Sequence, residues 1–132
     1  IYQSPKFAVV GASTSRAKYG NKVLRWYQAH KLNVVPLHPK EPEIEGIATL
    51  TSLDQLVDPQ LTSVSVITPP SITLQVLKDC QRLGISKIWL QPGAENKQVL
   101  DTAQELDLKI IAGGPCILVD GPSLLLRRNT KL

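Results

Sequence analysis

Several features that define other classes of protein are scarce or missing in this 132-residue chain. Its two cysteines, Cys80 and Cys116, form neither a disulfide framework nor a zinc-ligand spacing, which fits a reducing cytosol. The longest apolar runs have four to five residues, far below the roughly 18 to 20 that a membrane span needs. We therefore expect a cytoplasmic protein without a membrane span and without a metal site.

Acidic residues are absent from the first 40 positions, which hold seven lysines and arginines. The rest of the chain holds eleven acidic and eight basic residues, so the net charge of +4 comes from the N-terminal part. A transit peptide is also basic and poor in acids, but these residues form the first expected strand and helix. The pattern suits either a solvated charged face or a positive field for a phosphate-bearing ligand.

Aromatic residues make up only 5% of the chain. No basic strand interleaved with aromatics and no recognition helix is apparent, so the composition argues against a nucleic-acid partner despite the excess of basic residues. No Ser/His/Asp set, pair of carboxylates or activated thiol stands out either. We expect a binding protein and not an enzyme, and the catalytic set is predicted to be empty.

Short apolar strand signals alternate with helix signals up to residue 112. Strands are expected at 6–10, 33–37, 63–67, 87–90 and 109–112, and helices at 21–30, 52–57, 71–83 and 96–106. Single helices between strands imply right-handed crossovers and a sheet covered on both faces. The prediction is one Rossmann-like, doubly wound α/β domain over residues 1–132 with a five-stranded, mostly parallel sheet. A basic, frayed tail is expected at about 126–132.

The helix boundaries rest on capping residues and on apolar spacing. Asn21, Ser52 and Ser71 are expected to cap the first three helices, with Ser52 and Gln55 forming a capping box, and Gly84 is expected to end the third. The residues expected to face inward from the last two helices are Ile72, Val76, Leu77, Cys80, Leu83, Val99, Leu100, Ala103 and Leu106.

Ligands of doubly wound sheets bind outside the carboxyl ends of the strands, so the residues after each strand decide the site. The first strand is followed by Gly11, Ala12, Ser13, Thr14, Ser15 and Arg16, and then by a helix start. Small residues let backbone N–H groups approach a phosphate, hydroxyls add donors, and the helix dipole favours an anion. We predict a phosphate-binding loop here, with counter-charge from Arg16 and Lys18.

The loop differs from the dinucleotide pattern G-x-G-x-x-G, because Gly11 and Gly20 are its only glycines. A nicotinamide dinucleotide site also favours an acidic residue at the end of the second strand, where this chain has Leu37-His38-Pro39-Lys40. A cation at Lys40 suits a phosphate on the ribose, as in coenzyme A or NADP. His38 is interpreted as a loop residue with a satisfied hydrogen bond.

The third and fourth strands also end in short polar or rigid turns. Thr68, Pro69 and Pro70 form either a stiff helix entry or a flat apolar rim for an adenine or pantetheine group. Gln91, Pro92 and Gly93 bring an amide and a tight turn to the same edge.

Together these residues resemble the CoA-binding domain family, the small stand-alone relatives of the N-terminal domain of the succinyl-CoA synthetase α subunit. The resemblance covers about residues 5–120 and rests on VVGAS (9–13), VVPLHPK (34–40), IEGIATLTSL (44–53), ITPPS (67–71) and KIWLQPGAEN (87–96). It implies that CoA binds across the strand ends. The positions matching the family's CoA contacts are Ser13, Thr14, Ser15, Arg16, Lys40, Thr68, Pro69, Pro70, Leu90, Gln91 and Pro92.

Two departures from the ligase limit what the resemblance implies. The ligase has Thr-Glu where this chain has Gln91-Pro92, and its phosphohistidine domain and grasp partner are not among these residues. The expected function is therefore non-catalytic or regulatory binding of CoA or an acyl-CoA. The alternative is an NADP-type dinucleotide-binding oxidoreductase or sensor. Cys116, after the last strand, either forms a mixed disulfide with CoA or packs inertly, and Cys80 is expected to be inert.

Overall fold

The computed structural model describes residues 6–112, so the expected tail and Cys116 lie outside the described residues. The strands are β1 (Lys6–Val10), β2 (Val34–Leu37), β3 (Glu43–Ile44), β4 (Ile47–Ala48), β5 (Thr62–Val66), β6 (Lys87–Leu90) and β7 (Lys109–Ile111). The helices are α1 (Tyr19–Ala29), α2 (Pro70–Leu83) and α3 (Lys97–Glu105), with 3₁₀ turns η1 (Leu53–Gln55) and η2 (Pro59–Leu61). No helix in this range is long and apolar enough to cross a membrane.

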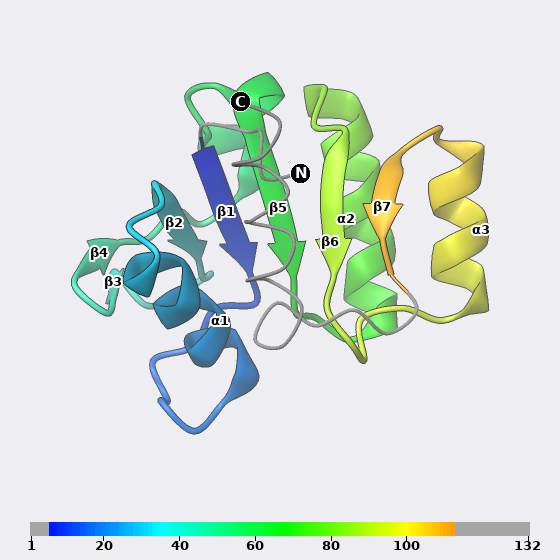
Figure 1. Cartoon of the computed structure of the whole chain (residues 1–132). Coiled ribbons are helices and arrows are strands. Elements are labelled where there is room, and N and C mark those ends of the chain that lie inside the picture. Colours follow the sequence, from blue (N-terminus) through cyan, green and yellow to red (C-terminus); the bar gives the residue numbers. More distant parts are fainter. Residues whose placement is uncertain (1–5, 113–132) are drawn as a thin grey trace.

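Five strands form one sheet in the order β2-β1-β5-β6-β7, and every pair in it is parallel. The prediction of a Rossmann-like α/β fold with a five-stranded sheet is confirmed. All carboxyl ends therefore lie at one edge of the sheet, at the bottom of Figure 1. The chain moves outward from β1 to β2 and then passes back to β5 on the other side of β1. The topological switch point, where ligands bind in such sheets, thus lies between β1 and β5.

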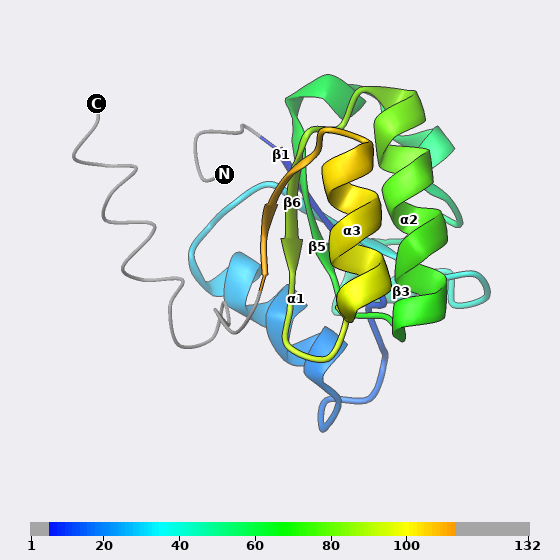
Figure 2. The ribbon, with the colours of Figure 1, turned by 90° about the vertical axis from the view of Figure 1, so that its right-hand side faces the viewer.

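The sheet is covered on both faces, with α1 on one side and α2 and α3 on the other (Figure 2). Along β1 the side chains alternate, because Phe7 and Val9 pack in the α1 layer whereas Ala8 packs in the α2/α3 layer. On the α1 face the hydroxyls of Tyr27 and the buried Ser65 are hydrogen-bonded at 2.6 Å. Burial raises the pKa of Tyr27, so this pair stays uncharged at neutral pH.

Two of the expected helix caps are wrong. Lys18 is the N-cap of α1, and Asn21 lies buried inside the helix because its amide binds the loop and the β3–β4 hairpin instead. Pro69 is the N-cap of α2, where a fixed φ suits the helix entry and replaces Ser71 as the boundary. Gly84 ends α2 in the left-handed conformation, with φ +77°, as predicted.

Two residues expected to face the core are exposed. Ile72, in the first turn of α2, is 52% exposed, and Leu100 on α3 is 38% exposed. The remaining inward residues of both helices are buried or half-buried, including Val76, Leu77 and Val99. Ile72 is exposed because it lies beside a cavity at the ligand edge of the sheet, described below.

The connection after β2 contains the two-stranded hairpin β3–β4. Its turn residues Glu45 and Gly46 both have positive φ, 49° and 81°, which is the conformation of a tight hairpin turn. The expected helix at 52–57 is a single 3₁₀ turn. Ser52 caps it by accepting from the Asp54 N–H at 3.2 Å, whereas the Gln55 side chain accepts from the Thr51 N–H, so no reciprocal capping box forms.

Candidate functional site

Two glycines bring the backbone of three elements into contact at the switch point. A Cβ on Gly11, at the end of β1, would lie 2.0 Å from the carbonyl oxygen of Ile67, just after β5. A Cβ on Gly20, in the first turn of α1, would lie 2.0 Å from the carbonyl oxygen of Gly11. Gly20 lies nine residues after Gly11. Its missing side chain allows α1 to pack closely against the end of β1, as the last glycine of a dinucleotide-binding turn does. Sequence reasoning noticed both glycines but missed this contact.

Two carbonyl oxygens of the loop between these glycines accept hydrogen bonds from side chains of α1. Asn21 Nδ2 donates to the Ser13 carbonyl at 2.9 Å, and an Arg25 guanidinium nitrogen donates to the Arg16 carbonyl at 3.1 Å. Within the described part of the chain, the N–H groups of Ser13 and Thr14 have no hydrogen-bond acceptor. Free N–H groups beside small residues can coordinate an anion.

The start of α1 lacks a side-chain cap. Lys18 is the N-cap residue, and its side chain gives no hydrogen bond to the first turn. The N–H groups at a helix start need an acceptor, which Ser, Thr, Asp or Asn usually supplies. A phosphate bound at this loop would fill that role and would be favoured by the helix dipole.

Glu45, at the tip of the β3–β4 hairpin, fixes the outer part of the loop. Its carboxylate accepts from Asn21 Nδ2 at 3.1 Å and from the Arg16 guanidinium at 3.2 Å. The hydrogen bond from Asn21, followed by the charge and hydrogen bond of Arg16, lowers the pKa of Glu45. Arg16, predicted to balance ligand phosphates, is therefore paired within the protein, while Thr14 and Ser15 are exposed.

Two adjoining cavities open at this edge of the sheet. The first, which we call the first-loop cleft, has a volume of about 420 Å³ and is lined by Gly11, Ala12, Ser13, Lys18, Tyr19, Gly20, His38 and Ile67. The second, the η1–α2 groove, has a volume of about 400 Å³. Its lining residues are Val10, Gly11, Ala12, Leu37, His38, Pro39, Thr51, Ser52, Leu53, Thr68, Ile72, Gln75, Val76 and Asp79. Gly11, Ala12 and His38 line both, so the two cavities meet at the first loop.

His38 was interpreted as a loop residue with a satisfied hydrogen bond. In the structure it also lies between the two cavities and lines both. Its Nδ1 accepts hydrogen bonds from the N–H groups of Lys40 and Glu41, at 3.0 and 2.9 Å. A ring nitrogen that accepts carries no proton, so the neutral ring has its N–H at Nε2. The satisfied hydrogen bond was foreseen, but the place of the ring between two cavities was not, because it depends on the tertiary fold.

Lys40 is exposed and lines neither cavity. It follows Pro39, which lines the η1–α2 groove, and its own N–H is held by His38. No ion pair ties its ammonium group to another described residue. Its long, flexible stem leaves the charge available to a ligand at the groove.

The turn after β5 contributes one residue to the groove. Thr68 lines it, and its hydroxyl is hydrogen-bonded to that of Thr73 at 2.8 Å. Pro69 and Pro70 form the start of α2 and line neither cavity. In this structure they act as the helix entry that fixes the Thr68 turn.

The turn after β6 lies next to the first-loop cleft. Gln91 is fully buried, and its Oε1 accepts from the hydroxyl of Tyr19, which lines the cleft, at 3.2 Å. Leu90 is buried in the core layer under α2 and α3, whereas Pro92 and Gly93 are exposed. The structure thus brings Gln91 to the cleft through Tyr19, and does not bring Leu90, Pro92 or Gly93 to either cavity.

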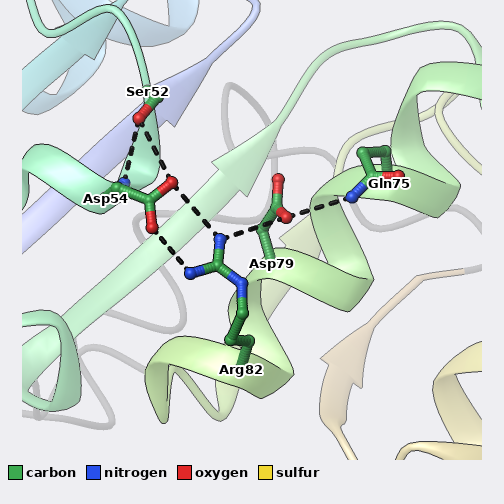
Figure 3. A network of polar contacts seen from close by, with 5 residues as sticks. All are labelled: Ser52, Asp54, Gln75, Asp79 and Arg82. Atoms are coloured by element: carbon green, nitrogen blue, oxygen red, sulfur yellow. Dashed lines mark hydrogen bonds and ion pairs between the residues drawn. The ribbon is translucent and has the colours of Figure 1, made fainter.

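A polar network that the sequence did not suggest joins η1 to α2 (Figure 3), and three of its members, Ser52, Gln75 and Asp79, also line the η1–α2 groove. Arg82 donates from one guanidinium nitrogen to Asp54 at 2.7 Å, and from the other to Asp54 and Asp79 at 3.3 Å each. Gln75 Nε2 also donates to Asp79, at 3.1 Å. The hydrogen bonds from Arg82 lower the pKa of Asp54. Arg82 therefore joins η1 to α2, the two walls of the groove.

The described residues offer neither a metal site nor an exposed thiol. Within residues 6–112 no group of three His, Cys, Asp or Glu side chains is arranged to hold a metal ion. Cys80 is buried, and burial raises the pKa of its thiol to about 12. The thiol therefore stays protonated at neutral pH, in line with its expected inertness.

Solved structures with the same fold come from several organisms. A conserved hypothetical protein from Pyrococcus furiosus is 35% identical with a TM-score of 0.79, and the match covers 87% of this chain and 97% of that one. A protein from Thermus thermophilus is 25% identical with a TM-score of 0.80, over 93% and 92% of the two chains. A dinucleotide-forming acetyl-coenzyme A synthetase from Ca. Korarchaeum cryptofilum shares the fold at 22% identity and a TM-score of 0.69, over 82% of this chain but 26% of that one.

The family assignment comes from a comparison with family models. No match is found among the curated proteins. The family described as "CoA binding domain" matches residues 5–122, a range that includes the first loop, both cavities and the turns after β5 and β6. This chain therefore belongs to the CoA binding domain family.

Proposed function

We propose that this protein binds coenzyme A or an acyl-CoA reversibly at the carboxyl edge of its sheet, as a binding or regulatory module without catalysis of its own. The observation that carries the proposal is the junction of the two cavities at Gly11, Ala12 and His38. Beside it, the first-loop cleft is lined by Ser13, whose N–H has no acceptor within residues 6–112, and by the start of α1, which has no side-chain cap. An elongated ligand with its phosphates in the middle fits this arrangement.

The two cavities suggest how the ligand runs. The η1–α2 groove is lined largely by apolar side chains such as Leu37, Leu53 and Val76, which suits a flat base. Lys40, which follows the groove residue Pro39, would then supply the cation for a ribose phosphate. The first-loop cleft continues toward Tyr19 and Gln91, so the pantetheine arm would extend over the ends of β5 and β6, past the turn that holds Pro92.

Binding without catalysis is supported by what surrounds the candidate groups. The Nδ1 of His38 is occupied by two backbone N–H groups, and His30 stacks on Trp26 on the far part of α1. Asp54 and Asp58 are in surface ion pairs with Arg82 and Lys6. None of these forms a nucleophile–base pair in a cavity. The use of cysteine favours a cytosolic location, which we include in the proposal.

An NADP-type dinucleotide is the other ligand to consider, because Lys40 would suit its ribose phosphate equally well. The spacing of Gly11 and Gly20 and the absence of an acidic residue directly after β2 argue against a dinucleotide. Parallel titrations with CoA and NADP separate the two, since only one of them should bind with saturation.

Calorimetric titration of CoA into the protein and into Ser13→Leu tests the site. Ser13 is half-buried in the first-loop cleft, and a branched side chain there would block the approach of a phosphate to the loop N–H groups. We expect CoA to bind the unmodified protein and Ser13→Leu to lose most of that affinity. Ser86→Leu, an exposed serine at the other end of the sheet, should bind normally. Equal CoA affinity of the unmodified protein, Ser13→Leu and Ser86→Leu would show that the phosphates do not bind at this loop.

A further inference from the structure

One side of α2 forms the wall of the η1–α2 groove over two helical turns. Ile72, Gln75, Val76 and Asp79 line the groove, and their spacing of three, four and seven residues places them on one helix face. From Ile72 at the ligand edge to Asp79 the helix rises about 10 Å. The groove is therefore deep enough along α2 to hold more than a phosphate, and it ends at a carboxylate.

Asp79 keeps one acceptor oxygen unused. Its Oδ1 accepts from Gln75 Nε2 at 3.1 Å and from Arg82 at 3.3 Å, so the carboxylate is held in one orientation (Figure 3). Among the described residues no donor contacts Oδ2. The side chain is 31% exposed, and a partly buried carboxylate that lines an apolar groove gains from a donor there.

The two ends of the combined cavity differ in charge. Asp54 and Asp79 share a single Arg82 at the far end, which leaves that end with one negative charge. Among the described residues, the first-loop cleft is lined by Lys18 and by no acidic side chain, and Lys40 directly follows Pro39, which lines the groove. A second phosphate is repelled from the Asp79 end, whereas a neutral group that only donates hydrogen bonds is favoured there.

We infer that Asp79 recognises the amino group of an adenine ring bound in the η1–α2 groove, so that the site selects 6-aminopurines over purines without that group. The inference rests on the proposed function and specifies its base selectivity. Leu37, Leu53 and Val76 would contact the faces of the ring, and the ring edge that carries the amino group would meet Oδ2 of Asp79. The carboxylate accepts hydrogen bonds and cannot donate them, so it matches the amino group and gains nothing from a C–H edge.

The test compares CoA with an analogue in which hydrogen replaces the amino group of the adenine, by titration calorimetry. A hydrogen bond to a charged group predicts that the unmodified protein binds CoA roughly tenfold or more tightly than the analogue. In Asp79→Ala the affinities for CoA and for the analogue should agree within about twofold. CoA should bind more weakly than it does to the unmodified protein, whereas the affinity for the analogue should not change. Alanine suits this helical position, and a thermal melt of the ligand-free variant shows whether it is folded.

Two control variants separate recognition from structure. Asp54→Ala removes the ion pair with Arg82 but not the Asp79 acceptor, so the preference for CoA over the analogue should survive. Asp101→Ala, at an exposed position of α3 that lines neither cavity, should behave as the unmodified protein. If the unmodified protein binds both ligands equally, or if Asp79→Ala keeps the preference, the inference is wrong although CoA binding stands. No binding of CoA at all would overturn the proposed function with it.

Discussion

The first-loop cleft and the η1–α2 groove meet at Gly11, yet they are built from different parts of the chain. The cleft depends on backbone contacts, in which Gly20 lies against the Gly11 carbonyl and Gly11 against that of Ile67. The groove depends on side chains, with Arg82 joining its two walls through Asp54 and Asp79. A glycine in such a backbone contact has no room for a side chain. A side chain that lines the groove, in contrast, can be replaced without moving the backbone.

This difference suggests that the two cavities bind different parts of the ligand. The phosphates, which are common to many nucleotides, would be held by backbone N–H groups and a helix start. The base, which differs between nucleotides, would be held by exposed or half-exposed side chains such as Gln75 and Asp79. Substitutions of Gly11 or Gly20 should therefore affect folding and binding together, and those around the groove should affect binding or selectivity with little loss of stability.

Gly20→Ala should have the largest effect. Alanine at a helical position is normally favourable by about 1 kcal/mol relative to glycine, but here its Cβ would lie 2.0 Å from the Gly11 carbonyl oxygen. Because two backbones must separate, we expect a net loss of about 2 kcal/mol or more in the free energy of unfolding. Urea denaturation measures this, and CoA titration of the folded fraction should show lost affinity.

Gly46→Ala is the control for that variant. Gly46 has a positive φ of 81° and nothing within 4 Å of a built Cβ, so its substitution adds backbone strain without a clash. The cost should be about 1–2 kcal/mol, and CoA affinity should not change. A Gly20→Ala protein more stable than the unmodified one would show that the cleft is not held by this backbone contact.

Lys40→Ala should have an intermediate effect that appears in binding alone. If the ammonium group pairs with the ribose phosphate, its loss should weaken CoA binding by about 1.5 kcal/mol, the low end for a hydrogen bond to a charged group, because the site is exposed. Dephospho-CoA, which lacks that phosphate, should bind both proteins equally. Equal losses for the two ligands would place the phosphate elsewhere.

Arg82→Ala should have the smallest of these effects, a slight loss of stability. Its pair with Asp54 is about half exposed on both sides, and exposed pairs contribute little. We expect a small fall in melting temperature that high salt reduces. Since Arg82 lowers the pKa of Asp54, the contribution is present above the unfolded pKa of about 4 and fades as the pH falls through the native value. A difference that persists at pH 2 would argue against the ion pair as its cause.

The sheet was predictable because its strands are short apolar runs with clear boundaries. The strands at 6–10 and 87–90 agree with β1 and β6 to the residue, β2 and β7 differ from the prediction by one residue at one end, and β5 is shifted by one residue. The first loop could be singled out as a candidate site for the same reason, since the end of a strand in this fold is also the ligand edge. Local signals were sufficient for these features.

The parts that were missed depend on contacts between distant segments. Gly20 acts through Gly11, Asn21 through the hairpin residue Glu45, and Arg82 through Asp54, which is 28 positions away. None of these pairs has a spacing that marks it along the chain. Asn21 illustrates the physical reason. Its side chain was expected to cap a helix, but in the folded protein it donates to the Ser13 carbonyl and to Glu45 instead.

Thermal unfolding with CoA, and in parallel with NAD, tests the central claim most directly. A ligand that binds only the native state stabilises it by an amount that grows with the logarithm of its excess over Kd, reaching about 2.7 kcal/mol at a hundredfold excess. We predict a melting temperature that rises steadily with CoA concentration and stays nearly constant with NAD, because no carboxylate directly follows β2 to bind the ribose hydroxyls. A larger rise with NAD than with CoA, or no rise with CoA at saturating concentrations, would contradict the account.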